Sequence, residues 1–152
     1  MNMRTLTEVV FADDADTTYI GEAAFMGATA LEGFTVPAGV SIVGDYAFCF
    51  SGVRTVDMSE ADEITVLPEY IFGENTRLAT ISLPENLVTI EGYAFYMASA
   101  LKNIVIPDSV TTIGEYAFYA CTSLESVSLP ANLKTLGASA FSRCLSLSLI
   151  HI

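Results

Sequence analysis

Residues 101–124 read Leu-Lys-Asn-Ile-Val-Ile-Pro-Asp-Ser-Val-Thr-Thr-Ile-Gly-Glu-Tyr-Ala-Phe-Tyr-Ala-Cys-Thr-Ser-Leu, and the chain repeats this pattern along its length. Each copy carries an anchor, in which an apolar residue is followed by Gly or a variable residue, two more variable residues, a small residue and Phe. Successive anchor phenylalanines lie 23, 24, 23, 23 and 23 residues apart, at Phe25, Phe48, Phe72, Phe95, Phe118 and Phe141. Such regular spacing indicates a repeat architecture.

A second element alternates with the anchor, and it has the pattern of a short strand. A Leu or Val is followed by two apolar residues at alternate positions and often by Pro, which cannot donate to a ladder and therefore ends the pairing. Stacked in parallel, such strands would lie roughly 4.8 Å apart. The predicted strand segments are residues 6–11, 31–37, 53–58, 78–84, 101–107, 124–130 and 147–152.

The two elements together predict one domain over residues 1–152, with about six repeats and seven short parallel strands on one face. Only about 17 residues remain per repeat for the return path, so turns or short 3-10 segments are expected on the other face. One Phe per coil would fill a continuous core, and stability would come from stacking between neighbouring repeats.

The repeat resembles the BspA-like, treponemal-type leucine-rich repeat, whose pattern is Leu-x-x-Ile-x-Ile-Pro-x-x-Val-x-x-Ile-Gly-x-x-Ala-Phe-x-x-Cys-x-x-Leu. The resemblance implies a leucine-rich-repeat solenoid wound as a right-handed superhelix. It also implies a bacterial surface or secreted protein used in adhesion and host contact. The matching positions are Leu101, Ile104, Ile106, Pro107, Val110, Ile113, Gly114, Ala117, Phe118, Cys121 and Leu124.

The charge balance excludes some partners. The chain carries a formal net charge of −12, and residues 1–76 hold 13 acidic side chains against two basic ones. Nucleic acids and anionic membranes both require Lys or Arg to neutralise phosphate, so we expect neither as a partner. The mean hydropathy is +0.50, but no apolar run approaches 18 residues, so no membrane insertion is predicted.

The two ends of the sequence carry their own expectations. Residues 1–11 hold no apolar signal-peptide region, so an extracellular or cell-surface location is expected only from the resemblance. The last predicted strand stops at Ile152, where Pro would follow, and we expect a truncated repeat there. An uncovered strand at that end predicts a possible homodimer through the C-terminal edge.

The first candidate site is the strand face that points away from the core, because solenoids commonly bind partners on such a surface. Its side chains are small, neutral and rich in hydroxyl groups, and they lack the basic and aromatic residues that nucleic acid requires. The alternative is a plain solvated sheet. The candidate partner-binding residues are Thr55, Asp57, Thr80, Ser82, Asn103, Ser126 and Ser128, with Val105 in the same row.

The second candidate is a column of tyrosines beside the anchor, at Tyr46, Tyr70, Tyr93 and Tyr116. Tyr offers apolar area together with a hydroxyl, so an exposed column predicts a glycan or peptide site. Asp45, Glu69 and Glu115 form the adjacent column, which Glu22 continues. The alternative is a ladder that is partly packed and structural.

Two acidic inserts form the third candidate. The segments from Phe11 to Ile20 and from Met58 to Leu67 are two residues longer than their counterparts. They are expected on the same edge, roughly 10 Å apart, where oxygen ligands would hold Ca²⁺ or a basic partner. The alternative is solvated loop charge. The candidate ligands are Asp13, Asp14, Asp16, Glu60, Asp62 and Glu63.

The sequence offers little for catalysis or for a cofactor, and neither is predicted. With His151 as the single His, no Ser-His-Asp or Cys-His arrangement can be assembled. Cys121 and Cys144 follow adjacent anchors at the same position and are expected to be reduced, packed thiols, although their predicted spacing permits a disulfide. Cys49 stands apart from both.

The leading functional prediction is therefore a non-enzymatic protein-interaction or adhesion scaffold, with a protein or glycan ligand. The alternative is a structural module that assembles through its uncapped ends, and the third reading is a carbohydrate-binding surface.

Overall fold

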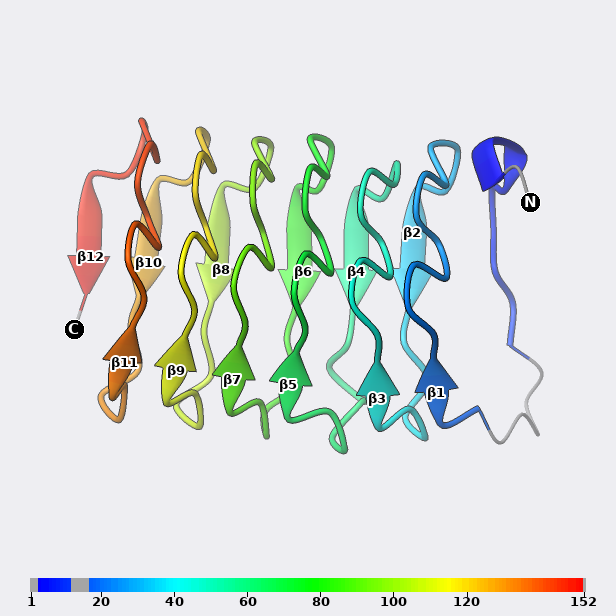
Figure 1. Ribbon diagram of the computed structural model, residues 1–152, viewed down its shortest axis with the longest axis horizontal. Helices are drawn as coiled ribbons and strands as arrows, with labels where there is room; N and C mark the ends of the chain where they lie inside the picture. Colours follow the sequence, from blue (N-terminus) through cyan, green and yellow to red (C-terminus); the bar gives the residue numbers. More distant parts are fainter. Residues whose placement is uncertain (1–2, 12–16, 152) are drawn as a thin grey trace.

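A computed structural model describes residues 3–11 and 17–151 as one elongated solenoid, with the termini at opposite ends (Figure 1). The chain rises along one side, crosses over the turns, descends along the other side and advances by one repeat. This path makes a right-handed superhelix, as the resemblance implied (Figure 1).

One side of the solenoid carries six three-residue strands, and each falls within a predicted strand segment. Adjacent members pair in parallel, in the two sheets β2-β4-β6 and β8-β10-β12. Their central residue faces the core and the residues beside it face outward, as alternation requires. The strands are β2 (Gly33–Thr35), β4 (Thr55–Asp57), β6 (Thr80–Ser82), β8 (Asn103–Val105), β10 (Ser126–Ser128) and β12 (Leu149–His151).

The opposite side carries a second row of two-residue strands that the sequence did not predict. Each ends on the apolar residue that opens the anchor, such as Ile90 or Ile113. These strands also pair in parallel, as β1-β3 and as β5-β7-β9-β11. They are β1 (Tyr19–Ile20), β3 (Ile42–Val43), β5 (Val66–Leu67), β7 (Thr89–Ile90), β9 (Thr112–Ile113) and β11 (Thr135–Leu136).

The first predicted strand, residues 6–11, was wrong. No strand is assigned there, and the short 3-10 helix η1 (Met3–Thr5) precedes the segment. Phe11 meets Phe34 edge-on, with ring centroids 5.9 Å apart. Side-chain packing therefore holds this segment in place without the backbone pairing that joins β2 to β4.

The core is one continuous column of phenylalanine rings along the solenoid axis. Phe48, Phe72, Phe95 and Phe118 are fully buried. Consecutive rings of this column stack with centroids 4.9–5.5 Å apart, and Phe141 continues the stack beyond Phe118 at 5.0 Å. Each coil thus buries one ring against its neighbours, as the repeat predicted.

The turn side is defined by two columns of residues in the left-handed backbone region. The anchor column includes Tyr46, Tyr70, Tyr93 and Tyr116, with φ between 52° and 59°. Four residues later, Gly27 and five non-glycine residues repeat this conformation. A side chain in this region is strained, so the surrounding hydrogen bonds must fix it in every coil.

Close backbone approach explains the anchor glycines. A Cβ on Gly114 would lie 2.4 Å from the backbone nitrogen of Gly92, and Gly44 and Gly137 are equally confined. Adjacent coils therefore touch here through their backbones. In the described part of the chain, no helix is long and apolar enough to cross a membrane.

Candidate functional site

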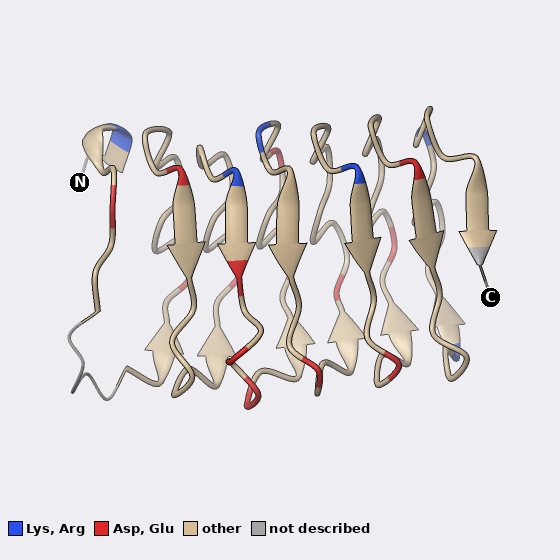
Figure 2. Ribbon diagram, turned by 180° about the vertical axis from the view of Figure 1, so that it is seen from behind, with Lys and Arg blue, Asp and Glu red and all other residues tan. Residues whose placement is uncertain are grey.

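The long strands form the side of the solenoid that faces the viewer in Figure 2, and most of their outward residues are small and polar. Thr55 lies beside Thr80 in the ladder, and Asp57 lies beside Ser82. Asn103 pairs with Ser126, whose hydroxyl donates to the Asn103 Oδ1 at 3.4 Å. The structure thus brings the seven predicted strand-face residues into one surface, which from here on we call the strand face.

A hollow of about 700 Å³ lies on the strand face near the N-terminal end. The outward residues of β2, β4 and β6 form its floor, and the segment 8–11 forms its wall. Val10 in that wall is 79% exposed. The sequence missed this wall because the segment has the same apolar pattern as a paired strand.

A second hollow of about 600 Å³ opens on the same face between β6 and β8. Its lining includes Ile81, Leu83 and Val105 together with Glu85 and Asp108 from the loops that follow the strands. Val105 is the one clue that the sequence gives, because it is an apolar residue in a row of polar ones. A third, smaller hollow of about 310 Å³ lies elsewhere, between β3 and β5.

The two edges of the strand face differ in charge (Figure 2). At the N-terminal ends of the strands, Glu32 pairs with Arg54 at 3.7 Å and with Arg77 at 3.2 Å. At the opposite edge, acidic side chains follow one another along the solenoid. They are Asp57, Glu60, Asp62, Glu63, Glu85 and Asp108, and Lys134 lies at the C-terminal end of that edge.

The Asp57 carboxylate is hydrogen-bonded within its own loop. Its carboxylate accepts hydrogen bonds from the Ser59 N–H at 3.0 Å and from the Ser59 hydroxyl at 2.8 Å. These bonds favour the charged form and lower the pKa of Asp57. The carboxylate therefore holds the start of the acidic insert while its side chain remains exposed on the strand face.

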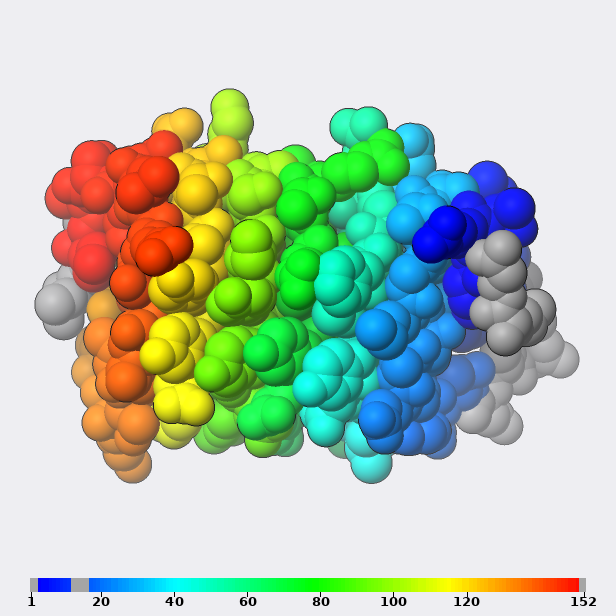
Figure 3. Space-filling model, turned by 45° about the horizontal axis from the view of Figure 1, so that its top comes forward, coloured from blue at the N-terminus to red at the C-terminus, as the bar shows by residue number. Residues whose placement is uncertain are grey.

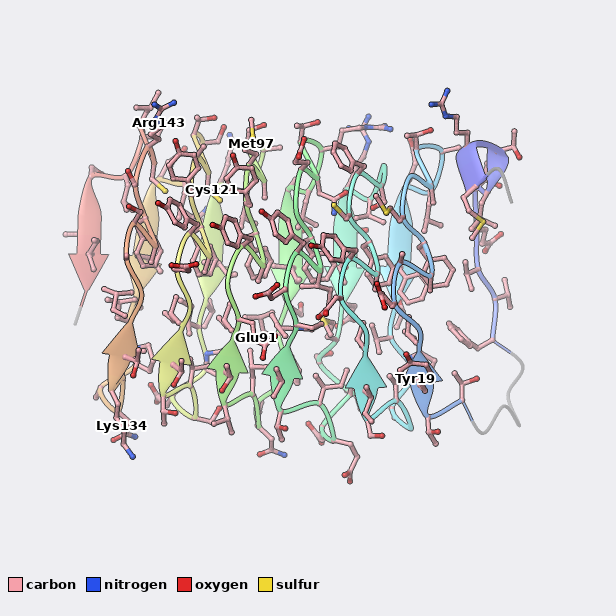
Figure 4. All side chains as sticks on the ribbon, viewed as in Figure 1. Tyr19, Glu91, Met97, Cys121, Lys134 and Arg143 are labelled. Carbon is pink, nitrogen blue, oxygen red and sulfur yellow. The ribbon has the colours of Figure 1, made fainter. Side chains whose placement is uncertain are left out.

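The four predicted tyrosines form a ladder on the turn side, where aromatic rings run in rows along the long axis (Figure 4). Ring centroids are 5.1, 4.6 and 5.1 Å apart from Tyr46 to Tyr116, with interplanar angles of 6–13°. The sequence missed a shorter second column, in which Tyr96 stacks on Tyr119 at 5.3 Å. Arg143 lies over the Tyr119 ring at 5.6 Å.

Stacking within the ladder restricts what it can bind. Each inner ring has a neighbour on both faces, and all four tyrosines are half-buried. Desolvation raises the pKa of Tyr70 and of Tyr93, with neighbouring phenols and carboxylates adding to it. A sugar that stacks on an aromatic needs an open ring face, so this geometry favours the packed, structural reading of the ladder. Figure 3 shows the repeats packed side by side as a continuous surface.

The structure describes three of the six candidate acidic ligands. Asp13, Asp14 and Asp16 lie outside the described residues. Glu60, Asp62 and Glu63 are exposed in the loop between β4 and β5. Within residues 3–11 and 17–151, no three acidic, His or Cys side chains gather closely enough to hold a metal ion.

The cysteines are free thiols, and two of them belong to a hydrogen-bonding column. Cys121 donates to the carbonyl of Phe95 at 3.2 Å and Cys144 to that of Phe118 at 3.1 Å. Asn75 takes the same position and donates to the Phe48 carbonyl at 2.6 Å. These three side chains each tie their own repeat to the anchor of the previous one.

The pKa values of the three thiols are shifted in different directions. Desolvation, with the charge of Glu74 adding to it, raises the pKa of Cys49 to about 11. The contact with the neighbouring Cys121 thiol lowers the pKa of Cys144, whereas the same contact and burial raise the pKa of Cys121. Cys144 is also the only one of the three that is not fully buried.

Fold and surface together define a leucine-rich-repeat scaffold, and comparison with known proteins gives its family. The profile of the BspA type leucine rich repeat region matches six copies, over residues 1–103 and 88–152. The chain belongs to this family. Comparison with the curated proteins finds no match.

Three solved structures show the same fold in bacterial proteins. A leucine-rich repeat protein from Bacteroides ovatus is 34% identical over 93% of this chain, with a TM-score of 0.81. The Treponema pallidum leucine rich repeat protein is 29% identical over 91%, with a TM-score of 0.61. A leucine rich cell surface protein from Faecalibacterium prausnitzii is 27% identical over 88%, with a TM-score of 0.61.

The chain spans only part of these relatives, covering 37%, 54% and 36% of their respective lengths. The family is one of bacterial surface-type repeat proteins that generally serve as non-catalytic interaction scaffolds. These relatives therefore do not show what this chain binds or where it is located.

Proposed function

We propose that this chain is the interaction scaffold of a bacterial surface or secreted protein, and that it binds a protein partner on its strand face. One observation carries the proposal: the two larger hollows both open on this face. Each hollow has room for side chains of a bound polypeptide.

The side chains of the strand face support this assignment. Thr55, Thr80 and Ser82 are exposed and contribute nothing to the core. They leave short hydroxyl groups at fixed positions on a rigid sheet, so a partner would lose little side-chain entropy by contacting them. On the turn side, the inner tyrosine rings are less accessible to a partner, because they stack on one another.

An array of purified secreted and cell-surface proteins tests the proposal. The labelled chain is compared with the variant Thr55→Arg/Thr80→Arg, which places two long side chains on adjacent strands, and with Ala138→Arg on the turn side. We expect the strand-face variant to lose the bound proteins and Ala138→Arg to retain them. Equal binding by all three chains would contradict the proposal.

Self-association is a second candidate, favoured by the apolar surface beside β12. Leu145 is 80% exposed, and Leu149 and Ile150 are 49% and 45% exposed. Within the described residues, β12 pairs only with β10. Light scattering across concentration, with and without Ca²⁺, tests this reading. A mass that rises with concentration and falls back in Ile150→Lys would support it, and a concentration-independent monomer would exclude it.

A carbohydrate-binding surface on the tyrosine ladder is the third candidate. It has the least support, because stacked rings leave few open faces for a sugar. Glycan binding lost in Tyr116→Ala, whose ring ends the ladder, would revive it.

A further inference from the structure

The sheet of long strands is split between β6 and β8. Within each half of the sheet, backbone bonds beside the ladders also join adjacent repeats: the Met58 N–H donates to the Ser82 carbonyl at 3.0 Å, and the Glu125 N–H donates to the Lys102 carbonyl at 2.9 Å. No ladder joins β6 to β8. In the part of the chain that the structure describes, neither Leu83 nor Lys102 donates a backbone hydrogen bond across this boundary.

The same two repeats are fully joined on the turn side. The Phe72 N–H donates to the Ala94 carbonyl at 2.8 Å, and the Glu91 N–H donates to the Leu67 carbonyl at 2.9 Å. At the lower end of the split, the Ser109 Oγ lies 2.6 Å from the Glu85 carbonyl oxygen and connects the two loops. The repeats are therefore held together behind and below an opening that faces outward.

The hollow of about 600 Å³ occupies this opening, which we call the interstrand slot. Its floor is apolar. Ile81 is only half-buried, whereas Val56 and Ile104 at the same position in neighbouring repeats are buried. Val105 is 80% exposed at the edge, where the next repeat carries Ser128.

The mouth of the slot is acidic. Glu85 and Asp108 each follow the proline that ends their strand, both are exposed, and both line the hollow. No Lys or Arg lines it. An apolar floor beside two carboxylates complements an apolar side chain next to a cation.

We propose that the interstrand slot receives an extended segment of the partner polypeptide in which an apolar residue adjoins Lys or Arg. The apolar side chain packs on Ile81 and Val105. The cation pairs with Glu85 and Asp108. This inference rests on the proposed function and specifies the partner's chemistry.

A fluorescein-labelled positional-scanning library of octapeptides tests the slot by fluorescence polarisation with the whole chain. We expect the retained peptides to place Leu, Ile, Val or Phe beside Lys or Arg. Val105→Asp puts a charge on the apolar edge at an exposed position, so it should weaken the retained peptides about tenfold or more. Circular dichroism and thermal unfolding check that the variant is folded.

The matched control is Val88→Asp, which makes the same change at an exposed valine just before β7, on the opposite side of the solenoid and outside the strand face. It should leave peptide affinity unchanged. The double variant Glu85→Lys/Asp108→Lys should exchange the preference for a basic neighbour for an acidic one. Retained peptides without the apolar-basic pair, or equal losses in Val105→Asp and Val88→Asp, would overturn the proposal.

The same variants distinguish failure of the slot proposal from failure of the strand-face proposal. Array partners lost in Thr55→Arg/Thr80→Arg but retained in Val105→Asp would eliminate the slot and leave the strand face as the binding surface. Partners unaffected by every strand-face variant would eliminate both.

Discussion

The turn side and the strand side of this solenoid are built from the same repeats, but their cohesion differs. On the turn side, phenylalanine and tyrosine rings stack from coil to coil, and backbone bonds such as Phe95 N–H to the Ala117 carbonyl at 2.7 Å join successive anchors. On the strand side, the sheet is interrupted between β6 and β8 and hollowed in two places. The row of short strands is also interrupted, between β3 and β5, but there the stacked Tyr46 and Tyr70 rings and the bond from the Tyr46 N–H to the Glu69 carbonyl join the two coils in the turns.

This difference separates stability from binding. The turn side buries aromatic surface and satisfies backbone groups, which is where a solenoid acquires its nearest-neighbour stabilisation. The strand side contributes one inward residue per strand, and most of the outward residues are exposed. Substitutions should therefore affect folding most on the turn side and partner binding most on the strand side.

Truncation of the phenylalanine column should have the largest effect. Phe95→Ala removes a fully buried ring that stacks on both neighbours. We expect the free energy of unfolding to fall by about 3–5 kcal/mol, measured by urea denaturation. A loss below about 1 kcal/mol would mean that this column is not the core.

Backbone contact on the turn side should be nearly as sensitive. Gly114→Ala would place its Cβ 2.4 Å from the Gly92 nitrogen, so we expect a loss of up to about 3 kcal/mol from overpacking. Gly27→Ala is the control, because nothing lies within 4 Å of its added Cβ and only the positive φ of 72° opposes it. Its expected cost is about 1 kcal/mol. Equal losses would mean that the coils do not touch at Gly114.

Loss of the buried amide should cost less. Asn75 donates to the Phe48 carbonyl at 2.6 Å and accepts from the Ser51 hydroxyl at 2.8 Å. Asn75→Ala leaves both partners buried without it, at about 1–3 kcal/mol. Asn75→Cys should recover part of that loss, because Cys121 makes the equivalent bond from the same position. Equal stability of the two variants would contradict this role.

A strand-face substitution should barely affect stability. Ser82 is exposed and lines both larger hollows. Ser82→Ala should change the free energy of unfolding by less than about 0.5 kcal/mol, while Ser82→Arg should block binding to the same array of proteins. A large stability loss on Ser82→Ala would mean that this face is structural after all.

The smallest expected difference is in the reactivity of two thiols. Alkylation by iodoacetamide at pH 8 requires the thiolate. Cys144, half-buried with a lowered pKa, should react before Cys49, whose pKa is about 11 and which therefore holds little thiolate. Peptide mass spectrometry over time would show the order, and faster labelling of Cys49 would contradict it.

The sequence predicts the coil well because the repeat constrains the interior. Positions such as Phe95 and Leu101 must be large and apolar in every repeat, so their spacing alone located the core and six of the seven predicted strands. The second row of strands was missed because a two-residue strand such as Thr89–Ile90 is too short to show alternation.

The candidate site was less predictable because it depends on relations between repeats. The outward position of Thr80 follows from alternation within its own strand. The split does not, since residues 78–84 and 101–107 both match the repeat and nothing in either segment indicates that β6 and β8 are unpaired. The half-buried state of Ile81 follows from that separation, so only the structure shows it.

Hydrogen exchange resolved by residue tests the separation of the two sides most directly. We predict fast exchange for the backbone amides of Leu83 and Lys102 at the split, and slow exchange for those of Phe72 and Phe95, which donate to Ala94 and Ala117 in the turns. The Met58 amide, which is bonded to Ser82 across the unbroken part of the sheet, should fall in the protected group. Equal protection at Leu83, Lys102 and Met58 would show that the strand sheet is continuous, and that result would contradict the account.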